Sequence, residues 1–349
     1  MKRIIFTIVF QLLFLFGFSS ILDSNSIKKD SIVYYKDHSE KLLIKLGITT
    51  TTPTLDIVNT YNNSTLTLKP VGQTSISAAM EYKWFGIGLG LGLPQNEKDI
   101  NTKGRTTNLD LQFNIYSKII GGDAYFQHYK GFHMSNPNSF SQWKSDTMPQ
   151  LGSMKQYAVG VSAFYITNHK RFSYGASYSR SSTQHKSAGS PLIGFYFNLD
   201  AAASDKGFVP FDSLLIAARD SFSIYAYSST NYGISLGYSY TLLLGKKFFT
   251  NITLMPGFGF KNITMKNFTI DTTGVDLSSS FSNRGISSRV MYRFAFGYEG
   301  EKYLFGMTFY GSYGAIQIEN FQFKPSLGTF RFFIARRFDV SSKNKPKKQ

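Results

Sequence analysis

Apolar side chains alternate with polar residues or glycines at a strict period of two in many separate segments of this chain. In residues 109–115 every second residue is apolar and the residues between are polar. In residues 85–93 glycines take the alternate positions, and a helix would lose stability at each of them. A period of two puts alternate side chains on opposite faces of a strand. The pattern therefore predicts strands with one apolar face.

Twelve such segments predict an all-β fold, a transmembrane antiparallel β-barrel over residues 41–338. The segments are 41–50, 75–83, 84–93, 106–117, 119–130, 155–167, 171–182, 230–243, 247–261, 285–298, 302–313 and 328–338. Short turns alternate with long connections, as periplasmic turns and outer loops do in outer-membrane barrels. The long connections are 51–74, 94–105, 131–154, 183–229, 262–284 and 314–327. An even number of strands predicts that both termini are periplasmic.

A thirteenth apolar segment, residues 192–198, would break this parity if it crossed the membrane. We therefore expect it within the longest outer loop, 183–229, as a hairpin or a segment folded back into the barrel mouth. The small residues Ser187, Ala188, Gly189 and Ser190 precede this segment. They predict a plug or gate at the outer mouth, and an ordinary surface loop is the alternative.

The N-terminus carries the pattern of a cleaved secretory signal peptide over residues 1–19. Lys2 and Arg3 precede an apolar run that reaches Phe18, and two small residues follow. A retained anchor is the alternative, but the run is shorter than the roughly 20 apolar residues that a spanning helix needs. We expect residues 20–40 to form a periplasmic segment.

The last predicted strand ends in alternating aromatic and aliphatic residues, like the strand that outer-membrane assembly machinery reads. These residues are Phe330, Phe332, Ile334 and Phe338. A basic tail, 339–349, follows and is expected in the periplasm. The formal charge is +17, and the basic residues are scattered. In an exported protein this charge favours anionic outer-membrane lipid, including lipopolysaccharide, over nucleic acid.

The chain resembles domain-of-unknown-function family 4421, an uncharacterised outer-membrane barrel family of Bacteroidota. Several stretches carry the resemblance along nearly the whole mature chain. They are residues 30–35, 39–42, 129–132 and 168–194, with the most specific words at 171–176 (RFSYGA) and 184–190 (QHKSAGS). Residues 68–71 depart from the family, which tends to have an aromatic residue and a Pro-Asn pair there. The resemblance implies a barrel in the outer membrane without an assigned reaction or ligand.

Few residues are suited to catalysis or metal binding. The chain has no cysteine, which excludes disulfides, a lipoprotein anchor and thiolate zinc sites. His128, His133 and His185 could meet near the outer rim with Ser187 or Ser190 as a nucleophile, but histidines that hydrogen-bond locally are the simpler interpretation. We expect no catalytic, cofactor or metal site, and no enzyme.

The face opposite each apolar stripe predicts charged side chains inside the barrel. The lumen candidates are Lys45, Glu81, Asp110, Asp123, Arg289, Arg293 and Arg331. One interpretation is a ladder of ion pairs that fills a narrow barrel. The other is a basic constriction that selects anions, since charged rings set selectivity in pores.

The leading functional hypothesis is passive passage or binding of small solutes, including anionic ones, through a polar lumen. The alternative is a surface-binding protein whose long outer loops hold a glycan, lipopolysaccharide or a partner protein. A barrel enzyme that acts on lipids is the third hypothesis.

Overall fold

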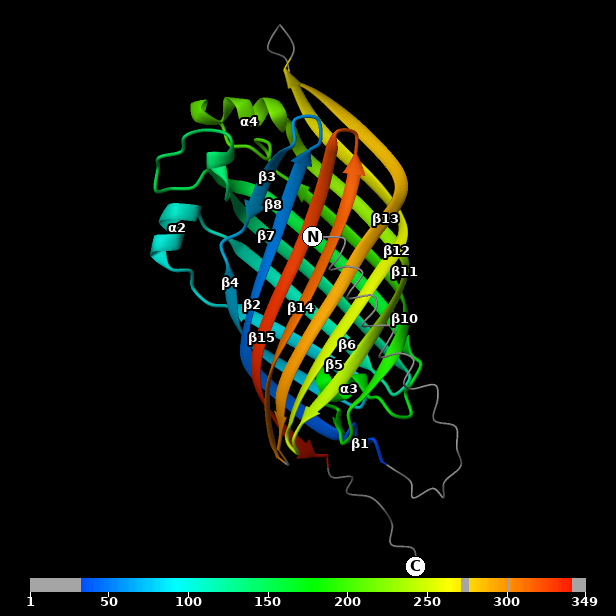
Figure 1. The fold of residues 1–349 in the computed structure, drawn as a ribbon. Coiled ribbons are helices and arrows are strands. Elements are labelled where there is room, and N and C mark those ends of the chain that lie inside the picture. The colour runs from blue at the N-terminus through cyan, green and yellow to red at the C-terminus, as the bar shows by residue number, and fades with distance from the viewer. Residues whose placement is uncertain (1–32, 271–275, 301, 341–349) are drawn as a thin grey trace, which may run out of the picture. The chain divides into compact units, whose positions relative to one another are not determined.

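The computed structural model describes residues 33–270, 276–300 and 302–340, and most of them belong to strands (Figure 1). The strands are β1 (Tyr35–Asp37), β2 (Lys41–Asn59), β3 (Ser64–Lys69), β4 (Gln73–Tyr82), β5 (Phe85–Gly92), β6 (Thr107–Tyr116), β7 (Ile120–Met134), β8 (Gln150–Ile166), β9 (Ser182–Gln184), β10 (Ala188–Ala203), β11 (Ile224–Leu244), β12 (Phe248–Ile270), β13 (Asp276–Glu299), β14 (Tyr303–Ile318) and β15 (Phe321–Asp339). The helices are α2 (Glu97–Lys103), α3 (Tyr174–Ser177) and α4 (Ile216–Ser221), with 3₁₀ turns η1 (Pro137–Ser139) and η2 (Ser213–Leu215). The signal peptide expected at 1–19 and most of the tail expected at 339–349 lie outside the described residues.

Twelve antiparallel strands close into a ring, which confirms the predicted fold class and strand number. The ring runs β2, β4, β5, β6, β7, β8, β10, β11, β12, β13, β14, β15 and returns to β2. The closing pair is continuous from Lys41 opposite Asp339 to Asn59 opposite Phe321. Strand β3 lies beside the ring and pairs with the far ends of β2 and β7. No helix among the described residues is long and apolar enough to span a membrane.

One spanning strand was assigned to the wrong segment. Residues 171–182 do not cross the wall; they contain α3 and lie inside the barrel. Residues 192–198 belong to β10, which pairs with β8 and β11 as a wall strand, so the outer loop expected at 183–229 is wrong. The cause is a strand with apolar side chains on both faces. Ile193 is 53% exposed on the outside, whereas Leu192 is 1% exposed and packs inward near α3.

Several strands continue well beyond the segments that the sequence indicated. The connections expected at 51–74, 262–284 and 314–327 are mostly strand, and only residues 319–320 join β14 to β15. Strand β12 has 23 residues, so it is about 75 Å long. At the tilt usual for barrels this is about twice the height of a hydrocarbon core.

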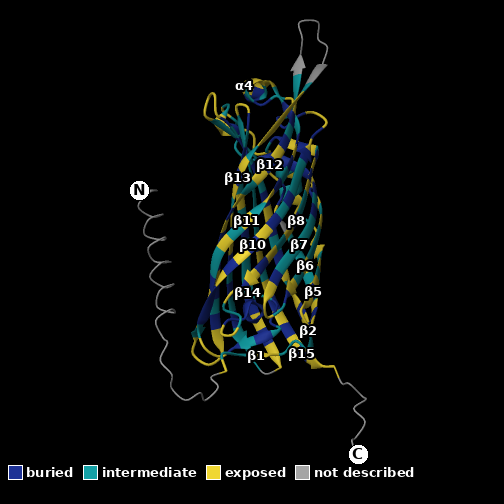
Figure 2. Ribbon diagram, turned by 90° about the vertical axis from the view of Figure 1, so that its right-hand side faces the viewer, coloured by how far each residue is buried: buried dark blue, intermediate teal, exposed yellow. Residues whose placement is uncertain are grey.

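The apolar face changes sides along these long strands. On β2, Leu46 is 60% and Ile48 51% exposed on the outside, whereas Leu55 and Ile57 further along are inside with 0% exposure. The outside is therefore apolar in one half of the barrel, and the inside is apolar in the other half. Figure 2 shows buried and exposed residues alternating along the wall strands.

The two ends of the barrel differ in their connections. At the short-turn end, brief turns join β4 to β5, β6 to β7, β11 to β12 and β13 to β14, and β1 pairs with β9 there. At the long-loop end lie α2, η1, η2 and α4. These two names are used below.

Candidate functional site in the barrel lumen

All seven charged residues predicted to face the lumen line cavities inside the barrel. Lys45, Glu81, Asp123, Arg293 and Arg331 line a lower cavity of 120 Å³, toward the short-turn end. Asp110 lines a small cavity beside it. Arg289 lines an upper cavity of 70 Å³. The strand alternation was therefore a sufficient guide to which charges point inward.

The lower lumen is filled by ion pairs. Lys45 Nζ lies 2.8 Å from Glu81 Oε1, and both side chains are about 7% exposed. Arg293 Nη2 lies 2.5 Å from Asp123 Oδ2. Buried charges of this kind persist when each has its partner. Asn114 also donates to Glu81, and a side chain at Gly86 would collide with the Glu81 carboxylate, which explains a glycine on this inner face.

Arg331 joins this network through neutral groups. Its guanidinium donates to Thr49 Oγ1 and Gln112 Oε1 at 3.1 Å and 2.9 Å. Gln112 and Gln127 in turn donate to Asp110. The lower lumen therefore matches the predicted ladder of ion pairs, and it does not present a ring of unpaired arginines.

A segment between β8 and β10, residues 168–187, closes the lumen at the short-turn end. We call it the inner segment. Its helix α3 is buried throughout, and Tyr174 packs at 4.7 Å from the Phe164 ring and from the Tyr178 ring. Tyr178 Oη donates to Asn251 Oδ1 of β12 at 2.8 Å, and Lys45 Nζ of β2 donates to the Tyr178 carbonyl. The segment is thus fixed to two separate strands of the wall.

The plug predicted at Ser187, Ala188, Gly189 and Ser190 is at the wrong end and in the wrong element. Ala188, Gly189 and Ser190 pair with β11 as the first residues of β10, and the Leu243 amide donates to Ser187 Oγ. Both contacts are at the short-turn end. Because these residues are small, β10 and β11 lie close together at this point. The lumen is filled instead by the aromatic residues of the inner segment, which come earlier in the chain.

A three-residue ion cluster fixes the inner segment to the wall; we call it the latch. Glu299 accepts from Arg180 Nη2 at 2.5 Å and from Arg337 Nη1 at 2.6 Å. Arg337 also donates to the Arg180 carbonyl at 2.9 Å, and Thr183 Oγ1 donates to Glu299 at 2.7 Å. Arg180 and Arg337 are 1% and 4% exposed, so both cations depend on this one carboxylate.

His38 borders the latch. Its ring nitrogen Nε2 lies 3.1 Å from Thr183 Oγ1. Burial, with a further contribution from the nearby Arg337 charge, lowers the pKa of His38 to about 4. His38 is therefore neutral at physiological pH, in keeping with the two cations beside it.

Apolar packing closes the long-loop end. The inner faces of β2, β3 and β12 present Leu55, Leu66 and Ile263, each 0% exposed. The connection 204–223 covers them with Phe208, Leu215 and Phe222. Both ends of the lumen are thus closed, one by a polar network and the other by an apolar core.

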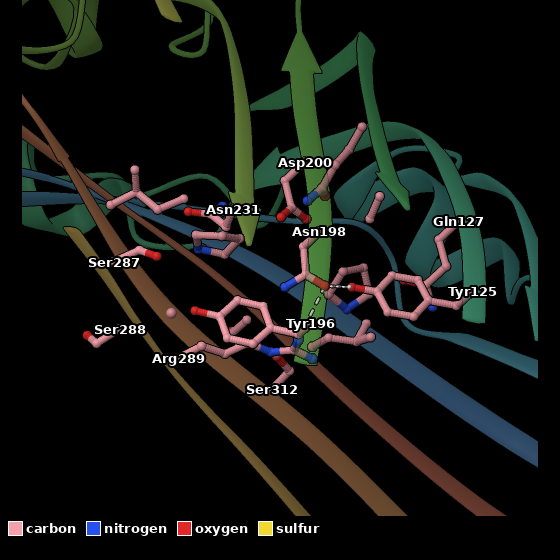
Figure 3. A pocket seen from close by; sticks show the side chains of 18 of the residues that line it. Tyr125, Gln127, Tyr196, Asn198, Asp200, Asn231, Ser287, Ser288, Arg289 and Ser312 are labelled. Atoms are coloured by element: carbon pink, nitrogen blue, oxygen red, sulfur yellow. Dashed lines mark hydrogen bonds between the residues drawn. The ribbon is translucent and has the colours of Figure 1, made fainter. Parts of the chain in front are cut away.

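The upper cavity lies between these two closures and is lined by polar side chains among apolar ones (Figure 3). Several buried polar atoms that line it have no hydrogen-bond partner among the described residues. They include Gln156 Oε1, Tyr196 Oη, Asn231 Oδ1 and Ser287 Oγ, on side chains at most 8% exposed. An unpaired buried polar group costs about 1–3 kcal/mol, so a cavity that collects several of them favours a hydrogen-bonding occupant, water or a small solute.

The histidines considered for catalysis do not come together. His133 is buried at the long-loop end, opposite Gln150, and burial with nearby Lys103 lowers its pKa to about 4. His185 is at the short-turn end, where its backbone pairs with Tyr34. His128 stacks on Tyr157 at 4.5 Å.

Sequence reasoning missed Asp200 and the latch residues. Asp200 belongs to β10, which was taken for a loop. Arg180 was expected on the spanning strand 171–182. An arginine within a run of small residues indicates a buried side chain that has a partner, and this signal was overlooked. Gln156 and Asn231, whose side-chain amides line the upper cavity, occupy inward-facing positions of β8 and β11. The alternation of inward and outward positions along each strand is enough to locate them.

Residues 28–338 match the model of a domain of unknown function, DUF4421, so the chain belongs to this family. No curated protein matches the chain. Among solved structures, the outer membrane protease OmpT from Escherichia coli is similar at TM-score 0.42 and 7% identity, covering 86% of this chain and 98% of that one. The Pseudomonas putida toluene transporter TodX gives 0.28 and 7%, covering 86% and 91%. The translocator domain of NalP from Neisseria meningitidis gives 0.32 and 8%, covering 97% and 98%. At such identities these similarities carry no functional information.

Proposed function

We propose that this DUF4421 chain is an integral barrel of the bacterial outer membrane that binds a small hydrophilic solute inside a closed lumen. The observation that carries the proposal is the upper cavity, where buried polar atoms without partners face one enclosed space. The lower lumen is paired by contrast, because Lys45 and Arg293 each have a carboxylate. Single unpaired atoms also occur lower in the barrel, at Arg293 Nε and Tyr174 Oη, but several of them gather around the upper cavity, which indicates a place for a solute.

The outer surface supports the membrane assignment. Exposed apolar side chains on β15 run from Phe330 to Phe338, a rise of about 20–25 Å for a tilted strand. This is the height of the apolar band on outer-membrane barrels. Beyond Phe330 the outside becomes polar, at Ser326 and Lys324 for example. We propose that the short-turn end is periplasmic and that the long-loop end extends outside the cell, with assembly machinery and outer-membrane lipid as the partners.

A permanently open pore is not favoured by this geometry. The inner segment closes the short-turn end, and the apolar core at Leu55 and Phe222 closes the other end. Passage would require both to move. Binding is therefore the part of the solute hypothesis that the geometry supports directly.

Three measurements test the proposal. The purified chain is reconstituted into liposomes, and swelling in sugars and small ions is compared with empty liposomes; equal rates are expected, and rapid swelling would establish an open pore instead. The chain is also refolded in non-ionic detergent with polar solutes of stated structure, and the thermal unfolding midpoint is measured. A solute that raises the midpoint supports lumen binding, and a panel without effect refutes it. Resistance to alkaline extraction from outer-membrane fractions tests the location.

A surface-binding role is the second candidate, favoured by an exposed apolar tip at the long-loop end. Phe211, Leu214 and Ile216 are 65%, 54% and 56% exposed around α4, and Arg219 stacks on Phe211 at 3.5 Å. Asn62 donates to Ser221, which brings the β2–β3 turn beside them. The paired substitutions Phe211→Ser and Ile216→Ser would abolish binding of lipopolysaccharide vesicles under this hypothesis, and unchanged vesicle binding would exclude a role for the tip.

A further inference from the structure

The upper cavity has an acceptor side formed by three adjacent strands. Asp200 on β10 lies opposite Ala158 of β8 and Ser229 of β11. Gln156 and Asn231 are each two residues from those positions, so their side chains share the inner face with Asp200. Asn231 is opposite Asn198 and Gln156 is opposite Ala202, so the two amides flank Asp200 on either side along β10. Figure 3 shows Asp200, Asn198 and Asn231 among the side chains that line the cavity. The acceptor side therefore consists of a carboxylate with an amide on each side of it.

These acceptors are not matched by donors of the protein. Asn231 Oδ1 and Gln156 Oε1 are buried without a partner. The half-buried Asp200 carboxylate accepts no hydrogen bond from any described residue, and only the charge of Arg289 acts on it, without an ion pair. A carboxylate withdrawn from water is costly unless a cation and hydrogen bonds compensate it. An ammonium group brings a positive charge and three N–H donors, which complement this carboxylate and a neighbouring amide oxygen.

The other side of the cavity offers unused donors on Arg289. Its guanidinium donates to Ser312 Oγ at 3.1 Å, to Asn198 Oδ1 at 3.3 Å and to Tyr310 Oη at 3.1 Å, one bond from each nitrogen. A guanidinium has five N–H groups, so one on Nη1 and one on Nη2 remain. Arg289 forms no ion pair with any carboxylate in the described part of the chain. Two remaining donors match a carboxylate.

We propose that the upper cavity binds a compact zwitterion of the amino-acid class, with its ammonium group at Asp200, between Asn231 and Gln156, and its carboxylate at Arg289. A space of 70 Å³ holds about five to seven water-sized spheres, so the ligand is small. An anion alone would be repelled by Asp200, and a cation alone would be repelled by Arg289. An uncharged polyol would neutralise neither charge. The inference rests on the proposed solute binding and names the class of solute.

The experiment separates the two charges of the ligand. The wild-type chain is refolded in non-ionic detergent with glycine, β-alanine, acetate, methylammonium or glycerol at equal concentration, because refolding gives each solute access before the lumen closes. The thermal unfolding midpoint is then measured, and the gel mobility of the unheated sample confirms a folded barrel. Glycine or β-alanine is expected to raise the midpoint, and the single-charge solutes and glycerol are expected to have no effect.

Variants locate the site. Asp200→Asn and Arg289→Gln are each expected to weaken zwitterion binding at least tenfold, measured from the concentration dependence of the midpoint. Arg331→Gln is the matched control, because it makes the same change in the lower cavity and is expected to leave the affinity within twofold.

The remaining outcomes overturn the inference in distinguishable ways. Stabilisation by glycerol alone would leave lumen binding intact and refute a zwitterion, as would equal stabilisation by acetate or methylammonium. Stabilisation by glycine that persists in both variants would place the ligand elsewhere. No stabilisation by any solute would refute the inference and the proposed function together. The wild-type panel decides between charge classes even where a variant does not fold.

Discussion

The latch allows a sharp test of how the inner segment is fixed, because one carboxylate serves two buried cations. Glu299→Ala leaves Arg180 and Arg337, 1% and 4% exposed, without their only anionic partner. Removing one partner of a buried ion pair costs about 3–5 kcal/mol. We therefore expect the free energy of unfolding in urea to fall by about that amount if the inner segment stays in place.

The alternative response of the same variant is local release. If the inner segment leaves the lumen before the wall unfolds, the loss of global stability is smaller than 3–5 kcal/mol, because the two arginines then reach water. In that case trypsin cleaves the folded Glu299→Ala barrel after Arg180, which becomes accessible, whereas the buried Arg180 of the wild type is protected. In both outcomes the latch holds the inner segment in the lumen. The two outcomes differ in whether the inner segment can leave while the wall stays folded.

A control at the same end of the barrel tests whether the loss of stability comes from the burial of the ion pair or from the loss of any ion pair. Lys41 Nζ lies 2.8 Å from Asp339 Oδ1, but these side chains are 41% and 83% exposed. Exposed pairs contribute little, so Lys41→Ala is expected to leave the urea midpoint unchanged within error. If Glu299→Ala is as stable as Lys41→Ala and its Arg180 stays protected from trypsin, the reasoning about the latch is refuted.

Three further predictions concern the wall and the short-turn end. Gly259→Ala is expected to lower unfolding stability by about 1–3 kcal/mol, because its Cβ would meet the Tyr232 carbonyl at 2.0 Å, whereas Gly88→Ala, with its nearest atom at 3.5 Å, should be neutral in the same urea titration. Ile252→Lys on the apolar belt is expected to cost about 2–4 kcal/mol in lipid vesicles, and equal stability with Asn262→Lys on the polar outside would contradict the belt. The pKa of His38, about 4 when folded and near 6.5 when unfolded, means that the unfolded chain takes up the proton first as the pH falls. Stability should therefore decline from pH 6.5 toward pH 4, and a pH profile that is identical in His38→Gln would refute this assignment.

Alternation predicted the barrel because lipid imposes one simple rule on the outside of each strand. Phe85, Leu91 and Ile252 face outward as expected, and the inner charges followed from the opposite parity. That rule holds only where the wall has lipid on one side and polar groups on the other. Residues 192–198 violate it because Leu192 packs near α3 while Ile193 faces outward.

The extension at the long-loop end was missed for a related reason. Outside the membrane the lipid-facing stripe ends, and the apolar residues move to the inner face, at Leu55 and Ile57 on β2 and at Ile316 and Ile318 on β14. The sequence does carry this signal, as an alternation whose phase shifts by one residue within a single strand. The latch could not be located in the same way, because Arg180, Glu299 and Arg337 are distant in sequence and meet only when the inner segment folds back.

The two closures of the lumen differ in what it costs to open them, and this difference indicates where a solute enters. At the long-loop end, Phe222, Leu215 and many partners are fully buried, and exposing each such side chain costs about 1.5–3 kcal/mol. Releasing the inner segment exposes two such side chains, Phe172 and Tyr174, which adds about 3–6 kcal/mol to the roughly 3–5 kcal/mol of the latch. Opening the long-loop end exposes at least four, Phe208, Val209, Leu215 and Phe222, together with their many apolar partners on the wall. The inner segment is also tethered to β8 and β10 at both ends, so it can swing out as a loop and return. We therefore expect exchange of the bound solute at the short-turn end, and faster exchange in Glu299→Ala than in the wild type.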